Sequence, residues 1–423
     1  MIDSVYVYTL GCRLNQAESE AISQAFRTGG FDIQKDYRNA SLIVVNTCTV
    51  TSKAEQKARR MIRLFQKCAE AVVVTGCYAQ MKENEIGALG KNIRVFSLKE
   101  KGSLLSLPLY LNENGRNPSA IFSFEKRETD PFVFDADVFS YHSRAYLKIQ
   151  DGCDNHCAFC QTSVARGKSV SLPVDEVVKR AKKIEEDGYH EIMLTGVNLT
   201  MYNHNEGGLA PLVEALLSSL GPDMRIRFSS LEADNVDDRL IDTFSDPRIM
   251  PHFHLPVQSA SNKVLARVER KYQIDEIEYI VRKIREKKDD PFISCDIITG
   301  LPGEEEEDYQ MTKDFLLKMD FAAFHVFPYS PREKTALFGA KDKSEERVRD
   351  KRAEELRRLS EIQTRKYIAR QEGKRVEVIY EKNGWGTSGN YLKVKVESSR
   401  SHESGELLYG VLYKINPPAV RII

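Results

Sequence analysis

Long hydrophobic runs are missing from this sequence, and none approaches the roughly 20 residues that a helix needs to cross a bilayer. The opening Met-Ile-Asp-Ser-Val carries neither a basic lead nor a long apolar stretch, so we expect no secretory signal. An excess of one charge sign is absent too: 62 Lys and Arg residues balance 62 Asp and Glu residues, which excludes a uniformly basic nucleic-acid coat. Solenoid repeats and low-complexity tails are also lacking. These absences predict a cytoplasmic protein with no membrane partner.

The composition is that of an ordinary folded chain. Its 423 residues predict about two to four domains, and 41% hydrophobic with 29% charged residues exclude wholesale disorder. Apolar β-rich runs alternate with helix-like stretches over residues 1–124, and again, in six units, over residues 142–335. The pattern predicts an α/β fold with an N-terminal parallel-sheet domain and a central (β/α)6 barrel. The barrel is expected to be partial, because a closed TIM barrel needs eight units.

The other segments are less regular. Residues 125–141 are predicted to form a linker, and residues 336–370 a helical connector with one long polar helix over 341–370. Residues 371–423 turn to short strands with glycine turns. The stretch 341–423 carries 19 basic and 13 acidic residues, a net charge of +6. This excess is either a solvated face or an electrostatic handle for an anionic partner.

Eight cysteines in a reducing compartment indicate metal binding or catalysis rather than disulfides. Three of them, Cys153, Cys157 and Cys160, form a C-x3-C-x2-C motif, called here the motif trio. Soft thiolates select Zn, Cu(I) or an iron–sulfur core. A structural zinc needs four closed ligands, and His156 is the only other donor nearby, whereas a [4Fe–4S] cube held by three thiolates keeps one iron open.

Three further cysteines each close an apolar β-rich run. Cys12, Cys48 and Cys77, called here the N-terminal trio, follow runs that are separated by helix-like stretches, so the strands are expected to be parallel. Ligands gather at the carboxyl ends of parallel strands, so these thiols are expected to converge on a second cluster. Taken singly, each is more often a buried apolar cysteine. Cys68 and Cys295 remain, and we interpret them as structural.

These residues carry a family resemblance. The motif trio, with Phe159 between its last two cysteines, resembles the signature of the radical S-adenosylmethionine (SAM) superfamily. Together with the N-terminal trio, the chain resembles the methylthiotransferase family over essentially its whole length. Further matching stretches are residues 165–169, 195–198, 229–232, 251–259, 296–304 and 327–332. One departure is Gln161-Thr162-Ser163-Val164, where the family usually has Ile-Pro, so the loop loses a fixed φ but no ligand.

The resemblance implies SAM and two [4Fe–4S] clusters as cofactors. The motif trio would hold the cluster whose open iron binds SAM and yields a 5′-deoxyadenosyl radical. The N-terminal trio would hold an auxiliary cluster carrying the sulfur for the product. One SAM would methylate that sulfur, and a second would supply the radical that abstracts a purine C2 hydrogen, which side-chain acid–base chemistry removes poorly.

The substrate is implied by the sequence around the first two cysteines. Residues 10–18 and 46–51 are most similar to the MtaB type, whose members methylthiolate C2 of N6-threonylcarbamoyladenosine at position 37 of tRNA. Alternatives within the family are isopentenyladenosine in tRNA and a ribosomal protein. An alternative of another class is a non-catalytic Fe–S or zinc RNA-binding protein.

The resemblance also implies SAM contacts from Phe159, Gly196, Asn198, Ser230, Glu232 and Arg270. Phe159 would pack on adenine, or be an ordinary core aromatic. Gly196 and Asn198 would bind the methionine amino group, or form a simple turn with Asn198 as N-cap. Glu232 would bind ribose, or lie solvated at a strand end. Arg270 would pair with the SAM carboxylate, or lie on the surface.

Residues 371–423 resemble the TRAM module, a small antiparallel β-barrel associated with RNA, with residues 385–394 as the matching core. Trp385, Tyr391 and the basic helix supply stacking and phosphate contacts of the kind RNA readers use. The alternative is a barrel that only packs against the catalytic domain. We therefore expect a tRNA anticodon stem-loop as partner, an external electron donor such as flavodoxin or ferredoxin, and a sulfur source that the sequence does not identify.

Overall fold

The N-terminal part of the chain forms a five-stranded parallel sheet. The computed structural model describes residues 1–136, 139, 143–203 and 207–422. The strand order is β2-β1-β3-β4-β5, with every neighbouring pair parallel. Both β3 and β4 are wholly buried, which explains why their apolar runs do not alternate. The predicted parallel sheet is confirmed, and its strands are β1 (Ser4–Thr9), β2 (Asp32–Ile33), β3 (Leu42–Thr47), β4 (Ala71–Gly76) and β5 (Ile93–Val95).

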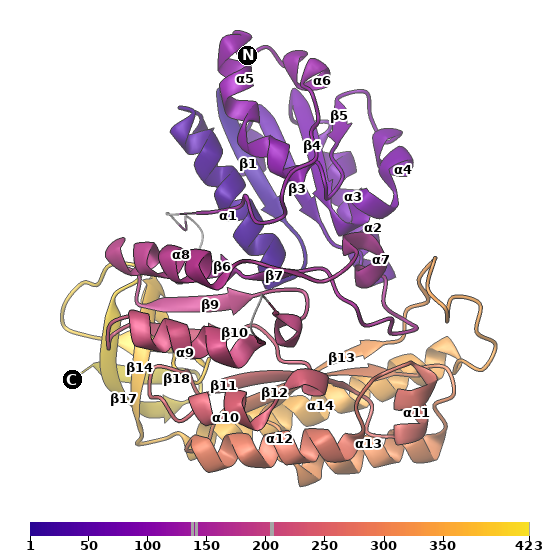
Figure 1. The fold of residues 1–423 in the computed structure, drawn as a ribbon, viewed down its shortest axis with the longest axis vertical. Coiled ribbons are helices and arrows are strands. Elements are labelled where there is room, and N and C mark those ends of the chain that lie inside the picture. The colour runs from indigo at the N-terminus through magenta and orange to yellow at the C-terminus, as the bar shows by residue number, and fades with distance from the viewer. Residues whose placement is uncertain (137–138, 140–142, 204–206, 423) are drawn as a thin grey trace.

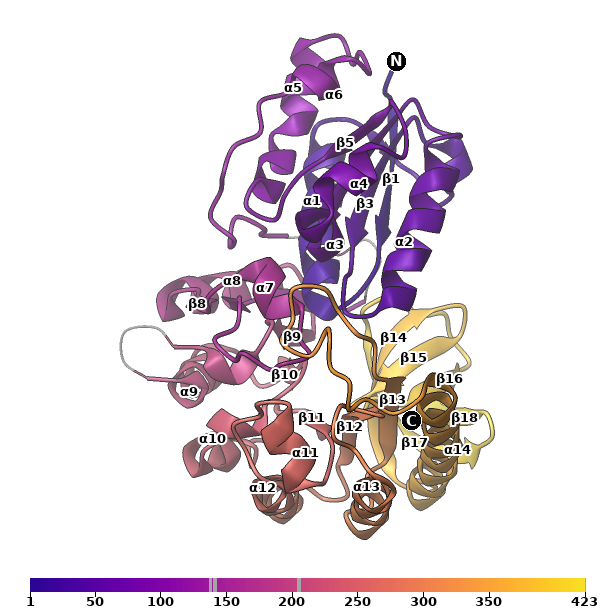
Figure 2. The same cartoon turned by 90° about the vertical axis from the view of Figure 1, so that its right-hand side faces the viewer.

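Helices cover both faces of this sheet. On one face α1 (Arg13–Thr28) packs Ile22 and Phe26 into the core, and on the other α2 (Ser52–Phe65) packs Ile62 and Phe65. Figure 2 shows the two helices on opposite sides of the strands. The remaining elements of this unit are η1 (Tyr37–Asn39), α3 (Cys77–Met81), α4 (Glu83–Gly87), η2 (Lys101–Leu105), α5 (Leu107–Glu113) and α6 (Ala120–Ser123).

The central part is a curved sheet of six parallel strands. Two three-stranded ladders, β10-β9-β6 and β11-β12-β13, meet where the Leu231 N–H donates to the His254 carbonyl at 2.9 Å and Ile226 pairs with Ile249. Among the described residues no ladder joins β6 to β13, so the barrel is open, and the predicted six-unit partial barrel is confirmed. The strands are β6 (Ala145–Lys148), β9 (Glu191–Thr195), β10 (Arg225–Phe228), β11 (His252–Gln258), β12 (Phe292–Thr299) and β13 (Ala323–Pro328).

Helices pack on the outer face of the barrel, and shorter elements form its loops. The outer helices are α8 (Val174–Glu186), α9 (Leu209–Ser219), α10 (Asp238–Thr243), α12 (Ile274–Lys287) and α13 (Glu306–Lys318). The shorter elements are β7 (Gln150–Asp151), α7 (Thr162–Arg166), β8 (Val170–Ser171), η3 (Leu199–Met201), η4 (Ala233–Asn235) and α11 (Asn262–Arg267). Figure 1 shows the N-terminal unit stacked above this barrel, with α7 and β7 between them.

The two connecting segments differ from the sequence expectation. The described part of the predicted linker is packed rather than extended, because Phe132 and Phe134 are buried in the core shared by the sheet and the barrel. Residues 137–138 and 140–142 of that linker lie outside the described residues. Helix α14 (Glu346–Arg370) begins five residues later than predicted, and in the loop before it Asp342 pairs with Arg267 at 3.0 Å and accepts the Gly303 N–H at 3.0 Å. No described helix has the length and apolarity needed to span a membrane.

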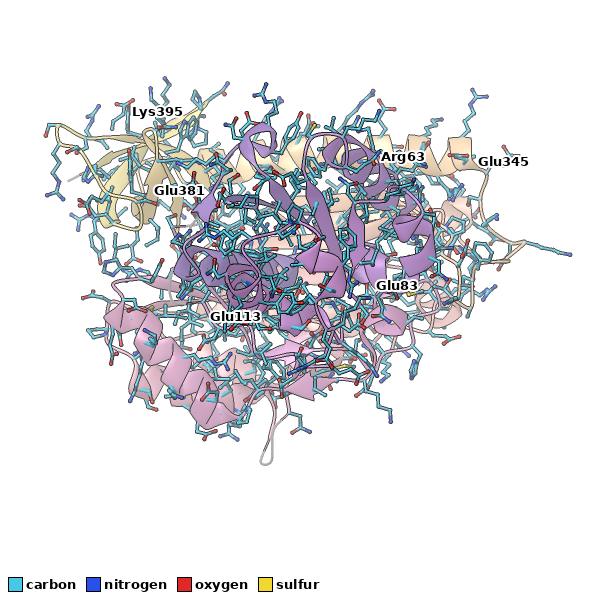
Figure 3. All side chains as sticks on the ribbon, turned by 90° about the horizontal axis from the view of Figure 1, so that it is seen from above. Arg63, Glu83, Glu113, Glu345, Glu381 and Lys395 are labelled. Atoms are coloured by element: carbon cyan, nitrogen blue, oxygen red, sulfur yellow. The ribbon has the colours of Figure 1, made fainter. Side chains whose placement is uncertain are left out.

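The C-terminal strands close into a five-stranded barrel of order β14-β15-β16-β18-β17. Four neighbouring pairs are antiparallel and one, β16 with β18, is parallel, so the predicted small antiparallel barrel is confirmed with a single parallel pair. The reason is parity, because strict alternation of direction cannot close a ring with an odd number of strands. The strands are β14 (Arg375–Lys382), β15 (Trp385–Ser388), β16 (Lys393–Glu397), β17 (Leu407–Ile415) and β18 (Pro418–Ile422). Seen from above, this barrel, with Glu381 and Lys395, lies at one end beside the N-terminal unit (Figure 3).

Strands β3 and β4 approach closely at their carboxyl ends. Gly76 has φ +98°, and a Cβ placed there would lie 2.3 Å from the Thr47 carbonyl oxygen. Only glycine fits such a left-handed position against backbone atoms. The close approach places Cys77, the next residue, beside the end of β3.

We expect Gly76→Ala to lower the free energy of unfolding by roughly 2–4 kcal/mol, because the new methyl group overlaps backbone and forces a strained φ. The matched control is Gly87→Ala at the end of α4, where an added Cβ meets nothing within 4 Å. That change should leave stability equal or raise it by up to about 1 kcal/mol. Denaturant unfolding measures both, and equal effects at the two positions would contradict the packing argument.

Candidate functional site

The N-terminal trio lies at one edge of the N-terminal sheet. Cys12 follows β1 at the N-cap position of α1, Cys48 follows β3, and Cys77 begins α3 directly after β4. Because β1, β3 and β4 are adjacent and parallel, their carboxyl ends bring the three thiols together. Burial, reinforced by the charge of Cys12, raises the pKa of Cys48 to about 12. Burial also raises the pKa of Cys77, although the nearby Arg166 guanidinium opposes that shift.

The motif trio lies on the loop between β7 and α7. Backbone hydrogen bonds fix this loop: the Cys153 N–H donates to the Gly167 carbonyl at 2.9 Å, and the Cys160 N–H donates to the Cys157 carbonyl at 2.9 Å. Burial raises the pKa of Cys153 to about 11, with contributions from the neighbouring Cys160 and Cys157 charges. Each thiol of the trio therefore lies within electrostatic range of the others.

The spacing of the thiols tests which metal group would fit. In the part of the chain that the structure describes, neither trio has all three sulfur atoms within 4.8 Å of one another. Zn–S bonds of 2.3 Å in a tetrahedron would place the sulfurs ~3.8 Å apart. A [4Fe–4S] cube holds its thiolates farther apart, because each binds a different iron. His156, the fourth ligand that zinc would need, is exposed and belongs to no such group. The residues present therefore fit clusters better than single zinc ions.

Ser163 stands where the family usually has proline, and the structure shows why this departure is tolerated. Ser163 occupies the first turn of α7, where a backbone N–H needs no partner within the helix. Its carbonyl accepts the Gly167 N–H at 2.9 Å. The loop therefore keeps a helical course without the fixed φ of proline.

Arg166, the last residue of α7, connects the two thiol sites. Its Nε donates to Cys77 Sγ at 3.4 Å, and its Nη2 donates to Asn15 Oδ1 at 2.9 Å. Helix α7 itself starts two residues after Cys160. One short helix thus runs from the motif trio in the barrel to the N-terminal trio in the sheet.

A buried ion network surrounds Arg166. Arg166 Nη1 donates to both oxygens of Asp151 at 2.9 Å, and Lys148 Nζ lies 2.8 Å from Glu18. Burial opposes ionisation of Glu18, but Lys101, Lys148 and Arg166 hold its pKa well below the usual value. The members of the network are Glu18, Lys101, Lys148, Asp151 and Arg166. It therefore contains three cations and two anions, and the excess positive charge faces Cys77.

Two residues expected to contact SAM are paired with each other. The Arg270 guanidinium forms an ion pair with Glu232, and its Nη1 donates to Cys157 Sγ at 3.3 Å. Neither the solvated glutamate nor the surface arginine that the sequence allowed is present, since both side chains are largely buried. Burial, with the Asp234 charge, raises the pKa of Glu232, while Arg270 opposes that shift.

The strand-end residues lie close to the motif trio. The Val197 and Asn198 N–H groups both donate to Gln150 Oε1 at 2.9 Å, and a Cβ on Gly196 would lie 2.7 Å from that oxygen. Asn198 occupies the N-cap position of η3, but its side chain makes no capping hydrogen bond; its Oδ1 instead accepts from the Thr200 hydroxyl at 2.9 Å. Its buried Nδ2 has no hydrogen-bond partner among the described residues and is left for another acceptor. Ser230 is half-buried just after β10.

Two cavities flank the motif trio. The smaller, about 130 Å³, is lined by Phe159 and Cys160 together with Gln258, Asp296 and Ile298. Gln258 has φ +66° beside a β-bulge in β11, a strained position that the sequence did not reveal. Phe159 is only half-buried, so it is available to a molecule in this cavity.

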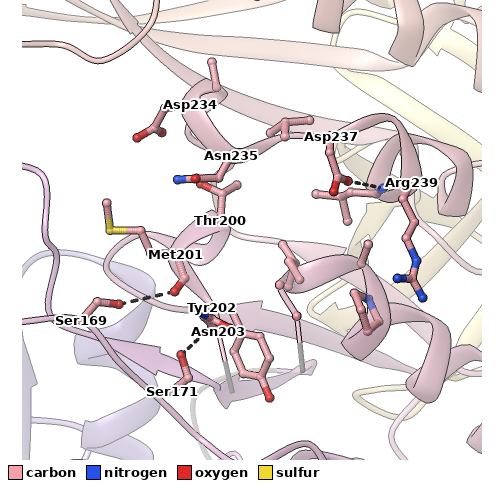
Figure 4. A pocket seen from close by; sticks show the side chains of 18 of the residues that line it. Ser169, Ser171, Thr200, Met201, Tyr202, Asn203, Asp234, Asn235, Asp237 and Arg239 are labelled. Atoms are coloured by element: carbon pink, nitrogen blue, oxygen red, sulfur yellow. Dashed lines mark hydrogen bonds between the residues drawn. The ribbon is translucent and has the colours of Figure 1, made fainter. Parts of the chain in front are cut away.

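The larger cavity, about 920 Å³, is lined by Met201, Asp234 and Asp154, the residue after Cys153 (Figure 4). Met201 Sδ lies 3.9 Å from Cys153 Sγ and forms part of its wall. Asp234 Oδ2 accepts a hydrogen bond from Asn155 at 3.0 Å, whereas its Oδ1 has no partner among the described residues. Sequence reasoning missed Met201 and Asp234, because only the fold brings their loops to the motif trio.

Tyr391 lies at the junction of all three parts of the molecule. Its ring stacks on His252 with centroids 4.2 Å apart, and the guanidinium of Arg227 lies 4.9 Å from the ring centroid. Arg13, the residue after Cys12, donates to its hydroxyl group. For Tyr391 the packing alternative therefore holds, whereas Trp385 remains 40% exposed.

Comparisons with known proteins agree with this architecture. Residues 147–316 match the radical SAM superfamily, and residues 4–97 match uncharacterized protein family UPF0004. The Treponema pallidum threonylcarbamoyladenosine tRNA methylthiotransferase MtaB is 34% identical over 93% of this chain and 94% of its own length, and relatives from other bacteria carry the same name. The Myxococcus xanthus ribosomal protein uS12 methylthiotransferase RimO is 32% identical over 89% of this chain and 80% of its own.

The fold also resembles solved structures. The radical SAM methyltransferase TsrM from Kitasatospora setae superposes with a TM-score of 0.58 at 13% identity, covering 80% of this chain and 77% of that one. At this identity the likeness shows the fold alone. The likeness covers both the N-terminal α/β unit and the open barrel in a single superposition.

Removing Arg166 tests how far the network joins sheet and barrel. We expect Arg166→Met to lower the free energy of unfolding by about 3 kcal/mol or more, because Asp151 and Glu18 lose buried charge-assisted hydrogen bonds. Arg239→Met is the control, since Arg239 pairs with Glu214 on the surface. That exposed pair should be worth less than about 1 kcal/mol. Denaturant unfolding compares the two, and a small Arg166 effect would contradict the structural role.

Proposed function

Because the chain belongs to the radical SAM methylthiotransferase family, we propose that it adds a methylthio group to C2 of N6-threonylcarbamoyladenosine in tRNA. The relatives named for this reaction match it at 31–34% identity over most of its length. The observation that carries the proposal is the pair of separate thiol trios joined through Arg166. A reaction that both activates an inert C–H bond and delivers sulfur needs two such sites.

The cofactors of the family are SAM and [4Fe–4S] clusters. When bound, they supply the radical chemistry that an unactivated purine C2–H bond requires. We assign one cluster to Cys153, Cys157 and Cys160 and the auxiliary, sulfur-delivering cluster to the N-terminal trio. The domain division follows: residues 1–124 hold the auxiliary site, 142–335 the SAM site, 336–370 connect, and 371–423 meet RNA.

The residues around the motif trio would bind and orient SAM. Phe159 offers an aromatic face to the smaller cavity, and the unpartnered Asn198 Nδ2 offers a hydrogen-bond donor. Arg270, which would pair with the SAM carboxylate, also donates to Cys157 Sγ and would stabilise thiolate charge there. Glu232 positions Arg270 through their ion pair, while Gly196 and Ser230 shape the strand ends nearby.

The residues around the N-terminal trio would stabilise an anionic sulfur site. The network of Glu18, Lys101, Lys148, Asp151 and Arg166 has one excess positive charge next to Cys77. In a buried setting that charge favours the thiolate over the thiol, and metal ligation needs the thiolate. Arg166 thereby positions Cys77 and supplies charge without titrating itself.

The C-terminal barrel offers a surface for RNA. Trp385 on β15 lies opposite Lys395 on β16, so an exposed ring and an ammonium group are side by side. A ring can stack on an unpaired base while the ammonium meets the adjacent phosphate. We propose the anticodon stem-loop, with the target at position 37, as the RNA bound, and a flavodoxin or ferredoxin as the electron donor.

Nucleoside mass spectrometry of tRNA tests substrate and reaction together. Cells lacking the protein should accumulate N6-threonylcarbamoyladenosine and lose its 2-methylthio derivative. Unchanged tRNA with loss of methylthio groups from a ribosomal protein would instead favour the activity named for the Myxococcus xanthus relative. Loss of the isopentenyladenosine derivative would indicate the other tRNA substrate of the family.

Cysteine variants test the division between the trios. In the anaerobically reconstituted protein, replacing the motif trio with alanine should abolish 5′-deoxyadenosine formation from SAM. Replacing Cys12, Cys48 and Cys77 should spare that cleavage but stop methylthiolation and remove about half of the bound iron, as expected for two four-iron clusters. Cys68→Ala, at an exposed cysteine outside both trios, should change neither product. Methylthiolation that survives loss of the N-terminal trio would refute the assignment.

RNA affinity tests the C-terminal surface. Trp385→Ala should weaken binding of the modified stem-loop by roughly tenfold, because aromatic stacking contributes about 1–3 kcal/mol per base. Ile362→Ala, on the exposed side of α14, removes apolar surface without stacking and should leave affinity within about twofold. Filter binding at fixed salt measures both, and equal effects would argue against Trp385 as the stacking residue.

A further inference from the structure

Three polar side chains meet on the barrel face of three adjacent strands. His254 lies on β11, Asp296 on β12 and His325 on β13. Asp296 and His325 are direct partners in the parallel register, and His254 is the partner of Ser294, which precedes Asp296 on the same face. One ligand atom from each of the three side chains lies within 4.8 Å of the others.

Asp296 orders this cluster. One oxygen lies 3.1 Å from His254 Nε2 and the other 3.3 Å from His325 Nδ1, so each imidazole donates one N–H to it. Burial opposes its charge, but the two imidazoles hold the pKa of Asp296 well below the usual range. The far nitrogen of His254, Nδ1, lies 2.9 Å from Ser294 Oγ, so both nitrogens of that ring are used.

His325 is different, because one of its nitrogens is free. Its Nδ1 is held by Asp296, and its Nε2 has no hydrogen-bond partner among the described residues. The side chain is 61% exposed, whereas that of His254 is 11% exposed. The two rings stack with centroids 5.1 Å apart and 30° between planes, which fixes the His325 ring. The cluster thus presents one oriented Nε2 atom to its surroundings.

The cluster adjoins the site where the motif trio acts. Asp296 lines the cavity of about 130 Å³ that is also lined by Phe159 and Cys160. Phe327, two residues after His325 and on the same face of β13, lines it as well. In adenine, N6 and C2 lie on the same edge of the ring, on either side of N1. A base whose C2 atom approaches this cavity therefore brings its N6 substituent close to the neighbouring wall of the barrel.

The N6 substituent of the modified adenosine determines which chemical group the enzyme has to recognise. A threonylcarbamoyl group ends in a threonine carboxylate, whereas an isopentenyl group is a hydrocarbon with no polar atom. An imidazole with both nitrogens protonated donates a strong hydrogen bond to a carboxylate. We propose that His325, positioned by Asp296 and His254, binds the carboxylate of the N6-threonylcarbamoyl group; this rests on the proposed function. His325 would then determine which modified adenosine the enzyme accepts.

A metal ion is the competing occupant, and the geometry favours it less. Both Asp296 oxygens already accept an imidazole N–H, which leaves the carboxylate satisfied without a cation. The strongly exposed His325 also makes an open cluster, whereas metal ligands are usually held by further hydrogen bonds on every side. The structure therefore favours a direct contact between the His325 imidazole and the substrate carboxylate over a bound metal ion.

The test is a cycle that changes both partners. Reconstituted wild-type enzyme and His325→Phe are assayed on stem-loop RNAs that carry either the natural threonylcarbamoyl group or an analogue with its carboxylate converted to a carboxamide. For wild type, the carboxamide should raise KM about tenfold to a hundredfold, the size of one lost charge-assisted hydrogen bond. His325→Phe should raise KM similarly on the natural substrate and show no further loss on the analogue. Methylthiolation kcat should change far less.

Controls separate a binding role from a folding defect. Iron content and 5′-deoxyadenosine formation should match wild type in His325→Phe. His190→Phe, at a half-buried histidine before β9, should leave the carboxylate preference intact. If His325→Phe still prefers the carboxylate as strongly as wild type, the inference is overturned. One equivalent of a non-iron divalent metal, present in wild type and lost in the variant, would overturn the direct contact.

The outcomes also separate this inference from the function it rests on. If wild type modifies neither RNA, the proposed function fails before His325 is tested. If wild type modifies the natural RNA but accepts the carboxamide equally well, the function stands and the inference fails. Only a carboxylate preference that disappears with His325 supports both.

Discussion

The buried pairing of Arg166 with Asp151 and Glu18 is the interaction on which the rest of this molecule depends. Its five charged members come from helices of the sheet unit and from two strands and the short helix α7 of the barrel, so neither unit can bury its charges alone. Removing so many charges from water is costly unless each meets a partner. The complete network therefore specifies one relative placement of sheet and barrel. Cys77 lies at its edge, within reach of the same guanidinium.

Thiols that are far apart in the chain come together within the sheet unit. Parallel strands end at a common edge, so the topology itself gathers Cys12, Cys48 and Cys77. The motif trio needs no such topology, because it spans only eight residues of one loop. Helix α7 then carries the chain from that loop to the sheet edge in a single turn and a half. Two sites of different origin thus become neighbours through a short local element.

What could be predicted from the sequence was local or periodic. The motif trio is recognised by the spacing of its three cysteines. The cysteines of the N-terminal trio are recognised because each follows an apolar run, and the open barrel is indicated by six repeated strand–helix units. Pairings between distant segments could not be predicted: the Arg270–Glu232 ion pair joins residues 38 positions apart, and Asp296 meets two histidines from neighbouring strands. The sequence places Phe132 and Phe134 in a predicted linker, because the residues that they pack against lie in other segments of the chain. The parallel β16–β18 pair follows from closing an odd ring, which local patterns do not encode.

Tyr391 changes how the C-terminal barrel should be regarded. Its ring fills a space bounded by His252 and by the guanidinium groups of Arg144 and Arg227, and Arg13 reaches it from the opposite unit. Cutting the barrel away would uncover these arginines, of which Arg144 and Arg227 share the single carboxylate of Glu191. The C-terminal barrel therefore could not be removed, or replaced by the barrel of a relative, without exposing these buried groups. The aromatic ring of Tyr391 and the arginines of the barrel interior therefore depend on each other for their burial.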